Sequence, residues 1–267
     1  MILNVHGHDA YFYTGGKPFN PELPAAVFIH GAQNDHSVWG LQTRYFAHHG
    51  FGVLAVDLPG HGRSKGAPLT SVEAMADWLL ALLDAAGVRQ ATLIGHSMGS
   101  LIALEAAHRA PDRVSKLAMV GTAYPMKVSE MLLDASKNAV QDAIDMVNIW
   151  SHSSIAQKPS CPGPGFYVMG GSRRLMQHIA RQEEQVFYTD FSACNAYANG
   201  EAAANSTTCP TLLLLGKRDM MTVPKAATTL TGAMPHARVV QLENCGHSLM
   251  AEQPDAVLDT LYGFANQ

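Results

Sequence analysis

A serine flanked by glycines is the residue of this sequence best placed for chemistry. The segment Gly95-His96-Ser97-Met98-Gly99 follows the apolar run 91–95 and precedes a helical pattern that begins at Met98. A strand, a sharp turn and a helix in this order present a serine hydroxyl at a helix N-terminus, where negative charge is favoured. Side chains at the two glycines would collide with neighbouring backbone. The pattern predicts that Ser97 is a nucleophile, and a helix-capping serine is the alternative.

A matching base and acid occur late in the chain. His247 stands between an apolar run and a helical pattern, and Asp219 comes shortly after the apolar run 211–216. Serine is activated by a histidine that an aspartate orients, so these residue types suit acyl transfer. Asp219 is also placed to cap a following helix, a role that aspartate takes for local reasons. We predict a triad of Ser97, His247 and Asp219, with helix capping as the alternative for Asp219.

The elements that must position these residues follow a regular alternation. Short apolar runs alternate with longer amphipathic stretches, which is typical of α/β proteins with a mostly parallel sheet. The expected strands span residues 25–30, 52–57, 91–95, 117–121, 211–216 and 238–242. The expected helices span residues 72–86, 98–109, 225–233 and 254–265. The candidate residues follow the carboxyl ends of strands, where ligands bind in open α/β sheets.

The alternation breaks between about Tyr124 and Asn205. Helix-like stretches there flank a turn-rich segment, and no strong strand pattern appears. We predict one α/β core formed by residues 1–123 and 206–267, with an inserted helical cap at 124–205.

Together these motifs resemble those of the α/β-hydrolase superfamily. GHSMG is a common form of its nucleophile elbow, and the segment 28–39 is similar to its histidine-glycine loop. The segment 246–254 is similar to its terminal G-H-x-x-x-x-E-x-P motif. The resemblance covers most of the chain outside the cap. It implies an α/β-hydrolase fold with the chain order nucleophile, acid, base, which the three candidate residues match.

The resemblance also implies roles for residues around the triad. It implies that the backbone N–H of Ala32 is one oxyanion donor, with that of Gln33 as its competitor, and that the N–H of Met98 is the second. Asp57 opens a turn similar to the family's D-x-P-G-x-G-x-S turn, and we expect it to anchor this turn rather than to act in catalysis.

The implied activity is hydrolysis through an acyl-enzyme, with no cofactor and no metal. We expect the substrate to be a small carboxylic ester with an apolar acyl part. The residues expected to contact it are Gln33, Trp150, Met146 and Phe166.

Enzymes that share these motifs also catalyse other reactions. One is carbon–carbon bond hydrolysis of a diketone from aromatic degradation, and another is cofactor-free perhydrolase or haloperoxidase chemistry. The first needs a cation for the substrate carboxylate, and the candidates lie in the cap: Arg173, Arg174 and Arg181. The non-enzymatic alternative is a ligand-binding receptor that keeps this fold.

Composition argues against several other classes. The formal charge is −4, from 18 basic and 22 acidic residues, and no basic run gives the footprint of a nucleic-acid binder. No signal-peptide pattern and no membrane-spanning run is present, which predicts a cytoplasmic protein. The four cysteines lack CxxC spacing, and the clusters His6-Gly7-His8-Asp9 and His48-His49 lack further ligands. We therefore predict no metal site.

Overall fold

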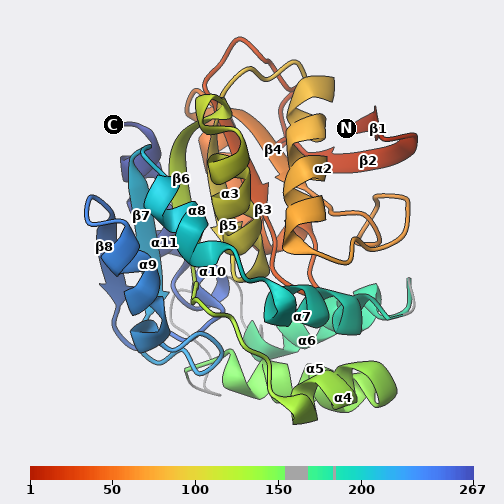
Figure 1. Ribbon diagram of the computed structural model, residues 1–267. Coiled ribbons are helices and arrows are strands. Elements are labelled where there is room, and N and C mark those ends of the chain that lie inside the picture. Colours follow the sequence, from red (N-terminus) through yellow and green to blue (C-terminus); the bar gives the residue numbers. More distant parts are fainter. Residues whose placement is uncertain (154–167, 183–184) are drawn as a thin grey trace.

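An eight-stranded sheet forms the centre of the computed structural model, which describes residues 1–153, 168–182 and 185–267 (Figure 1). The strand order is β1-β2-β4-β3-β5-β6-β7-β8. Strands β1 and β2 pair antiparallel with their neighbours, and all other pairs are parallel. The mostly parallel sheet with flanking helices confirms the predicted α/β-hydrolase fold. The strands are β1 (Ile2–Val5), β2 (His8–Tyr13), β3 (Ala25–Ile29), β4 (Gly52–Val56), β5 (Ala91–His96), β6 (Val114–Val120), β7 (Thr211–Gly216) and β8 (Arg238–Leu242).

The first two strands form a hairpin that the sequence did not predict. Val5 pairs with His8, and the two residues between them have positive φ angles, 50° at His6 and 86° at Gly7. A two-residue turn with both φ angles positive matches the twist of an antiparallel pair. The spacing of the first histidine cluster is therefore that of a tight turn.

The parallel strands β3, β4, β5 and β7 are buried on both faces of the sheet, whereas the edge strand β8 is largely exposed. Along β3, Ala25, Val27 and Ile29 join one apolar cluster, while Ala26 and Phe28 join the other. One face is covered by α2 (Val72–Ala85), α3 (Met98–Arg109), α8 (Gly200–Ser206) and α9 (Thr228–Ala233). The opposite face is covered by α1 (Gly40–His48), α10 (Leu249–Glu252) and α11 (Pro254–Ala265). Two covered faces explain why the sequence shows continuous apolar runs rather than alternation.

The helix bounds agree with the sequence at some places and differ at others. Helices α3 and α11 span the predicted residues. The helix expected at 225–233 is a 3₁₀ turn, η3 (Pro224–Ala227), followed by α9. Helix α1 was not predicted, because its glycine, glutamine and threonine weaken the apolar pattern. No helix in the described ranges is both long and apolar enough to cross a bilayer.

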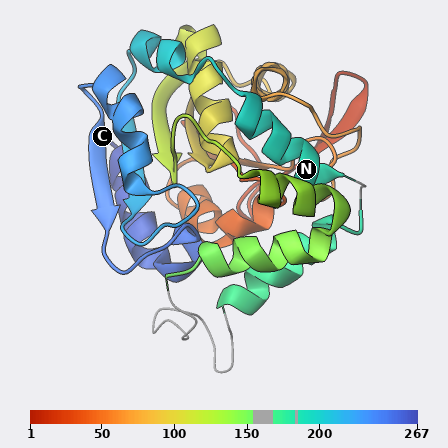
Figure 2. The ribbon, with the colours of Figure 1, turned by 60° about the horizontal axis from the view of Figure 1, so that its bottom comes forward.

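Helices inserted between β6 and β7 lie across the carboxyl ends of the strands (Figures 1 and 2). They are α4 (Glu130–Asn138), α5 (Val140–Trp150), α6 (Val168–Ile179) and α7 (Val186–Ala196), and they share an apolar cluster of their own. Helix α8 follows them but packs against α3 with the core, through Ala203 and Ala204. The described part of the region expected as a cap is thus largely helical, and its last helix, α8, packs with the core.

Candidate active site

Ser97 occupies the sharp turn between β5 and α3. Its φ and ψ are 52° and −119°, a strained conformation for a residue with a side chain. A Cβ at Gly95 would overlap the carbonyl oxygen of Gly99, and a Cβ at Gly99 would overlap that of Ile29. Both positions therefore require glycine. The Ser97 N–H donates to the carbonyl of Val120 at 2.9 Å, which ties the turn to β6.

Asp219 and His247 meet from the loops that follow β7 and β8. Oδ2 of Asp219 lies 2.8 Å from Nδ1 of His247, and both side chains are buried. Oδ1 of Asp219 accepts the N–H groups of Met221 and Thr222, each at 2.8 Å. The hydroxyl of Thr222 donates to Oδ2 at 2.7 Å and lies 3.1 Å from the same His247 nitrogen. The sequence analysis did not identify Thr222, because its contacts require the two loops to be side by side.

The alternative role of Asp219 as a helix cap does not match its contacts. The next helical turn, η3, has Val223 at its N-cap and no side-chain capping bond. The Asp219 carboxylate instead closes its own loop. Burial by itself would raise the pKa of Asp219, but the charge of His247 and the hydrogen bonds from His247 and Thr222 outweigh burial and lower it. The group is thus held as a carboxylate beside the imidazole.

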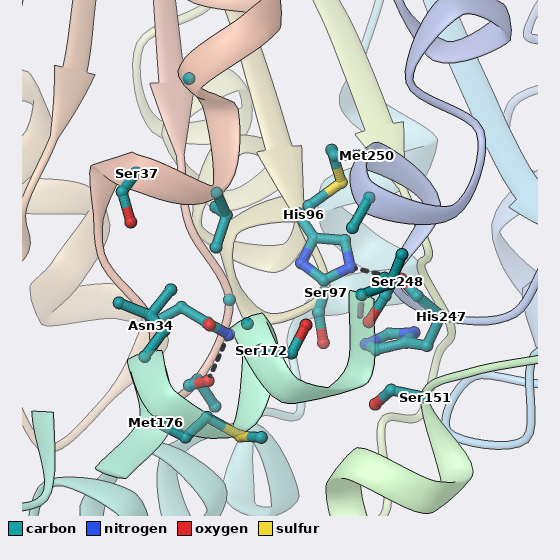
Figure 3. Close-up of a pocket in the computed structure, with 18 of the residues that line it drawn as sticks. Asn34, Ser37, His96, Ser97, Ser151, Ser172, Met176, His247, Ser248 and Met250 are labelled. Atoms are coloured by element: carbon teal, nitrogen blue, oxygen red, sulfur yellow. Dashed lines mark hydrogen bonds between the residues drawn. The ribbon is translucent and has the colours of Figure 1, made fainter. Parts of the chain in front are cut away.

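Ser97 and His247 face the same pocket (Figure 3). Within the described residues, no hydrogen bond joins the two side chains. Catalytic hydrogen bonds often tighten only once substrate is bound, so shared access to the pocket is the relevant geometry here.

The loop after β3 contains the two candidates for the first oxyanion donor, Ala32 and Gln33. Ala32 lines the pocket, whereas the N–H of Gln33 donates to Oδ2 of Asp190 at 2.8 Å. Gln33 is fully buried and its Nε2 donates to the carbonyl of Met176, so its side chain is not on the pocket wall. The N–H of Met98 lies in the first turn of α3, where helices lack internal acceptors. The geometry favours Ala32 over Gln33 as the partner of Met98.

The pocket is a cavity of about 650 Å³ between the inserted helices and the core. This volume suits a small organic ligand. Its walls are largely apolar, and the described lining residues include no aspartate or glutamate. Apolar lining residues from both sides are Val38, Leu41, Val147, Leu175, Phe191 and Met250.

Two of the residues expected to contact substrate point elsewhere. Met146 and Trp150 pack against the apolar cluster of the cap, and the pocket wall from the end of this helix is instead Val147, Asn148 and Ser151. Helical periodicity identifies the apolar residues of a helix. When both sides of the helix are covered, it does not show which of these residues face the pocket and which face the other helices. Phe166 lies outside the described residues.

The cap arginines are not part of the pocket wall either. Nε of Arg173 lies 2.6 Å from Oδ1 of Asp145, in an ion pair that joins α6 to α5. Arg174 and Arg181 are likewise absent from the lining. Arg44 is the one lysine or arginine among the described lining residues.

Asp57 anchors its turn, as its position in the sequence predicts. Oδ1 accepts the backbone N–H of His36 at 2.8 Å and lies 2.7 Å from Nδ1 of the same residue, while Oδ2 accepts the N–H of Arg63 at 2.9 Å. Possible ligand atoms of Asp35, His36 and Asp57 lie within 4.8 Å of one another. Because these hydrogen bonds already use the Asp57 oxygens, we assign no metal to the cluster.

Comparison with known proteins agrees with this geometry. A family model described as "alpha/beta hydrolase fold" matches residues 24–254. The chain is 26% identical over 261 residues to a pimeloyl-(acyl-carrier protein) methyl ester esterase of Nitrosospira multiformis, covering 91% of this chain and 95% of that protein. It is 24% identical to Esterase YbfF of Escherichia coli K12 over the whole of both chains. The crystal structure of an enol-lactonase from Burkholderia xenovorans superimposes over the whole of both chains with a TM-score of 0.85 and 22% identity.

Proposed function

Because the chain belongs to the alpha/beta hydrolase fold family, we propose that it is a serine hydrolase that cleaves a small carboxylic ester. Ser97 is the nucleophile, His247 the general base and Asp219 the carboxylate that orients it. One observation carries the proposal: the imidazole held at 2.8 Å by Asp219 opens onto the pocket that contains Ser97. The esterase names of the two full-length relatives support the ester as the substrate class.

In the first half-reaction, His247 takes the proton of Ser97 while Oγ attacks the ester carbonyl carbon. The carbonyl oxygen becomes an oxyanion, which accepts hydrogen bonds from the N–H groups of Ala32 and Met98. Asp219 fixes the tautomer of the imidazole and stabilises the imidazolium. The carbon–oxygen bond of the leaving group then breaks, and His247 protonates the released alcohol. Ser97 is left as an acyl ester.

In the second half-reaction, a water molecule takes the place of the alcohol. His247 removes a proton from this water, and the hydroxide attacks the acyl carbon through a second oxyanion in the same two-donor site. The bond to Ser97 Oγ breaks and the serine recovers its proton from His247. The products are a carboxylic acid and free enzyme, and the cycle uses only side chains, backbone and water.

The walls of the pocket support an apolar acyl group. Val147, Leu175 and Phe191 line it from the cap, and no described lining residue carries a carboxylate that would repel an anionic product. For carbon–carbon hydrolysis, the three cap arginines suggested for a substrate carboxylate do not line the pocket, so that among the described residues this role would fall to Arg44.

A substrate panel tests the proposal. p-Nitrophenyl esters of graded acyl length are assayed beside a carbon–carbon substrate of the vinylogous diketone type and beside peroxide-dependent halogenation. We expect ester hydrolysis to have the highest kcat/KM. Turnover of the diketone or the peroxide reaction in preference to every ester would overturn the assignment, and tight ligand binding without turnover would favour a receptor.

A further inference from the structure

Cap helix α7 places a buried carboxylate beside the oxyanion loop. Oδ2 of Asp190 accepts the backbone N–H of Gln33 at 2.8 Å. The same oxygen lies 2.9 Å from Nε2 of His61, which belongs to the turn after β4. All three residues are at most 1% exposed. One carboxylate oxygen therefore joins the cap, the oxyanion loop and a turn of the core.

His61 is bound tightly enough to fix this carboxylate. Its Nδ1 lies 3.0 Å from the carbonyl of Pro59, so each ring nitrogen has an acceptor. Burial by itself would lower the pKa of His61, but the charge of Asp190 and their hydrogen bond outweigh burial and raise it. The other titratable groups around this ring are His30, whose ring centroid lies 4.8 Å away, and Asp57. An imidazolium that donates on both sides holds Asp190 against the core.

Gln33 has a backbone conformation that it would not adopt by itself. Its φ is 56°, in the left-handed region, where a residue with a side chain is strained by about 1–3 kcal/mol. Two cap contacts hold it there: Asp190 on its N–H, and the carbonyl of Met176, which accepts from its Nε2 at 3.0 Å. The conformation of the oxyanion loop is thus imposed by the cap.

Burial of the Asp190 carboxylate in an ion pair is weak evidence that the pair is there for stability. Among the described residues, the second oxygen of Asp190, Oδ1, has no hydrogen-bond partner although it is buried. A buried ion pair with an unsatisfied oxygen commonly contributes less to stability than an apolar pair of the same size. The consequence of the carboxylate therefore lies in the geometry that it imposes on Gln33.

We propose that Asp190 is a positioning residue for the oxyanion hole. Held by His61, its Oδ2 fixes the N–H of Gln33 and with it the Ala32–Gln33 peptide, which adjoins the peptide that carries the N–H of Ala32. Oxyanion donors act only when they lie about 2.7–3.1 Å from the developing charge, so a small rotation of this peptide reduces the rate. The inference rests on the proposed function, and it makes the cap a part of the catalytic machinery as well as a cover for the pocket.

The test is Asp190→Asn, assayed with the best p-nitrophenyl ester of the panel. Asparagine keeps the shape of the side chain but removes the charge that orders Gln33 and His61. We expect kcat to fall about 10–100-fold, less than the loss seen when an oxyanion donor is removed outright, with KM changed less than about threefold. The inhibition constant of an aryl trifluoromethyl ketone, which forms a tetrahedral adduct, should rise by the same factor as kcat falls.

Asp145→Asn is the matched control. It also removes a cap carboxylate from an ion pair, the one with Arg173, but Asp145 does not contact the oxyanion loop. We expect kcat, KM and ketone inhibition to stay within about twofold of the parent. If Asp190→Asn behaves in the same way as this control, or if kcat and KM change together, Asp190 is only structural and the inference is overturned. A parent enzyme that neither hydrolyses esters nor binds the ketone would instead refute the proposed function.

A second variant covers the case in which Asp190→Asn fails to fold. His61→Gln loosens the same carboxylate from the core side and should also lower kcat selectively. Because both residues act through one contact, the double variant should have the kcat of Asp190→Asn within about threefold, rather than the product of both losses. A His61→Gln variant with the ketone affinity and kcat of the parent would contradict the inference by itself.

Discussion

Nε2 of His96 lies 2.9 Å from the carbonyl oxygen of His247, which joins the serine turn directly to the loop of the base. Burial and the nearby charge of His247 lower the pKa of His96 to about 3, so its ring is neutral and donates through Nε2. His30, behind the oxyanion loop, is also buried, and its pKa is lowered to about 4 by burial and by His61. The active-site floor thus contains two histidines that must remain uncharged.

These two histidines predict a loss of stability in acid. A histidine whose pKa is lowered on folding stabilises the fold above its unfolded pKa of about 6.5, and this stability is lost as the pH falls towards the folded value. At pH 5, each of these two histidines lowers the free energy of unfolding by about 2 kcal/mol. His61 affects stability in the opposite direction. Because its pKa is raised on folding, it stabilises the fold below about pH 6.5, and this stability is lost as the pH rises. We expect a net decrease in Tm from pH 7.5 to pH 5, measured by circular dichroism.

Replacing one of the neutral rings tests this explanation. His96→Gln keeps a donor for the carbonyl of His247 but removes the titration. Its Tm should fall less than that of the parent over the same pH range. An equal fall in both proteins would show that His96 does not contribute to the acid sensitivity.

Asp219→Asn separates an orienting carboxylate from a structural one. Asparagine can still accept the N–H groups of Met221 and Thr222 through its oxygen, so the loop and Tm should change little. The amide favours the wrong tautomer of His247, and kcat should fall on the order of 10⁴-fold, as in the protease precedent. Glu243→Gln is the control, since this exposed carboxylate pairs with Lys217 on the surface. A variant that keeps more than about a tenth of parental kcat would remove Asp219 from the triad.

Thr222→Val tests the hydroxyl between the acid and the base. Valine has nearly the same shape but cannot donate to Asp219 Oδ2, so the carboxylate loses one of its hydrogen bonds. We expect kcat to fall about 5–30-fold, corresponding to about 1–2 kcal/mol for the lost hydrogen bond. Steady-state kinetics with one ester measure this. An unchanged kcat would mean that the hydroxyl plays no part in orienting the imidazole.

Val147→Phe tests which face of α5 selects the acyl group. Val147 is on the pocket wall, so a larger side chain should shift the preference to shorter acyl groups. Ile149→Phe, two residues along the same helix, changes an exposed side chain and should leave the preference as it is. The ratio of kcat/KM for long and short esters measures the effect. Equal ratios in the two variants would show that α5 does not line the acyl site.

The positions of the central strands followed from the sequence because these strands are buried at every position. Runs such as Thr211–Gly216 are apolar at almost every position. A short run of this kind fits a buried strand at the centre of the sheet and few other positions in a small protein. The hairpin of β1 and β2 was missed, because its strands are short and half exposed. β-strand propensity alone does not identify strands of this kind.

The residues of the proposed triad could be named from the sequence, but the residues that contact this site from distant segments could not. Ser97 and its glycines form one contiguous motif, which a local pattern can identify. Thr222, Asp190 and His61 act through contacts between distant segments, such as the 129 residues that separate His61 from Asp190. The sequence suggested Met146 and Trp150 for the pocket and did not point to Val147, because a helix covered on two sides gives no sign of which face meets the pocket.

Covalent labelling of Ser97 tests the central claim most directly. The protein is treated with a fluorophosphonate, and the adduct is located by mass spectrometry while ester hydrolysis is followed in parallel. We predict one adduct per chain, on the peptide that contains Ser97, with activity lost in proportion to labelling. Ser97→Ala should take up no label and hydrolyse no ester, with a Tm at or slightly above that of the parent. Ester hydrolysis that persists in Ser97→Ala, or an adduct on another residue that accounts for the lost activity, would contradict the account.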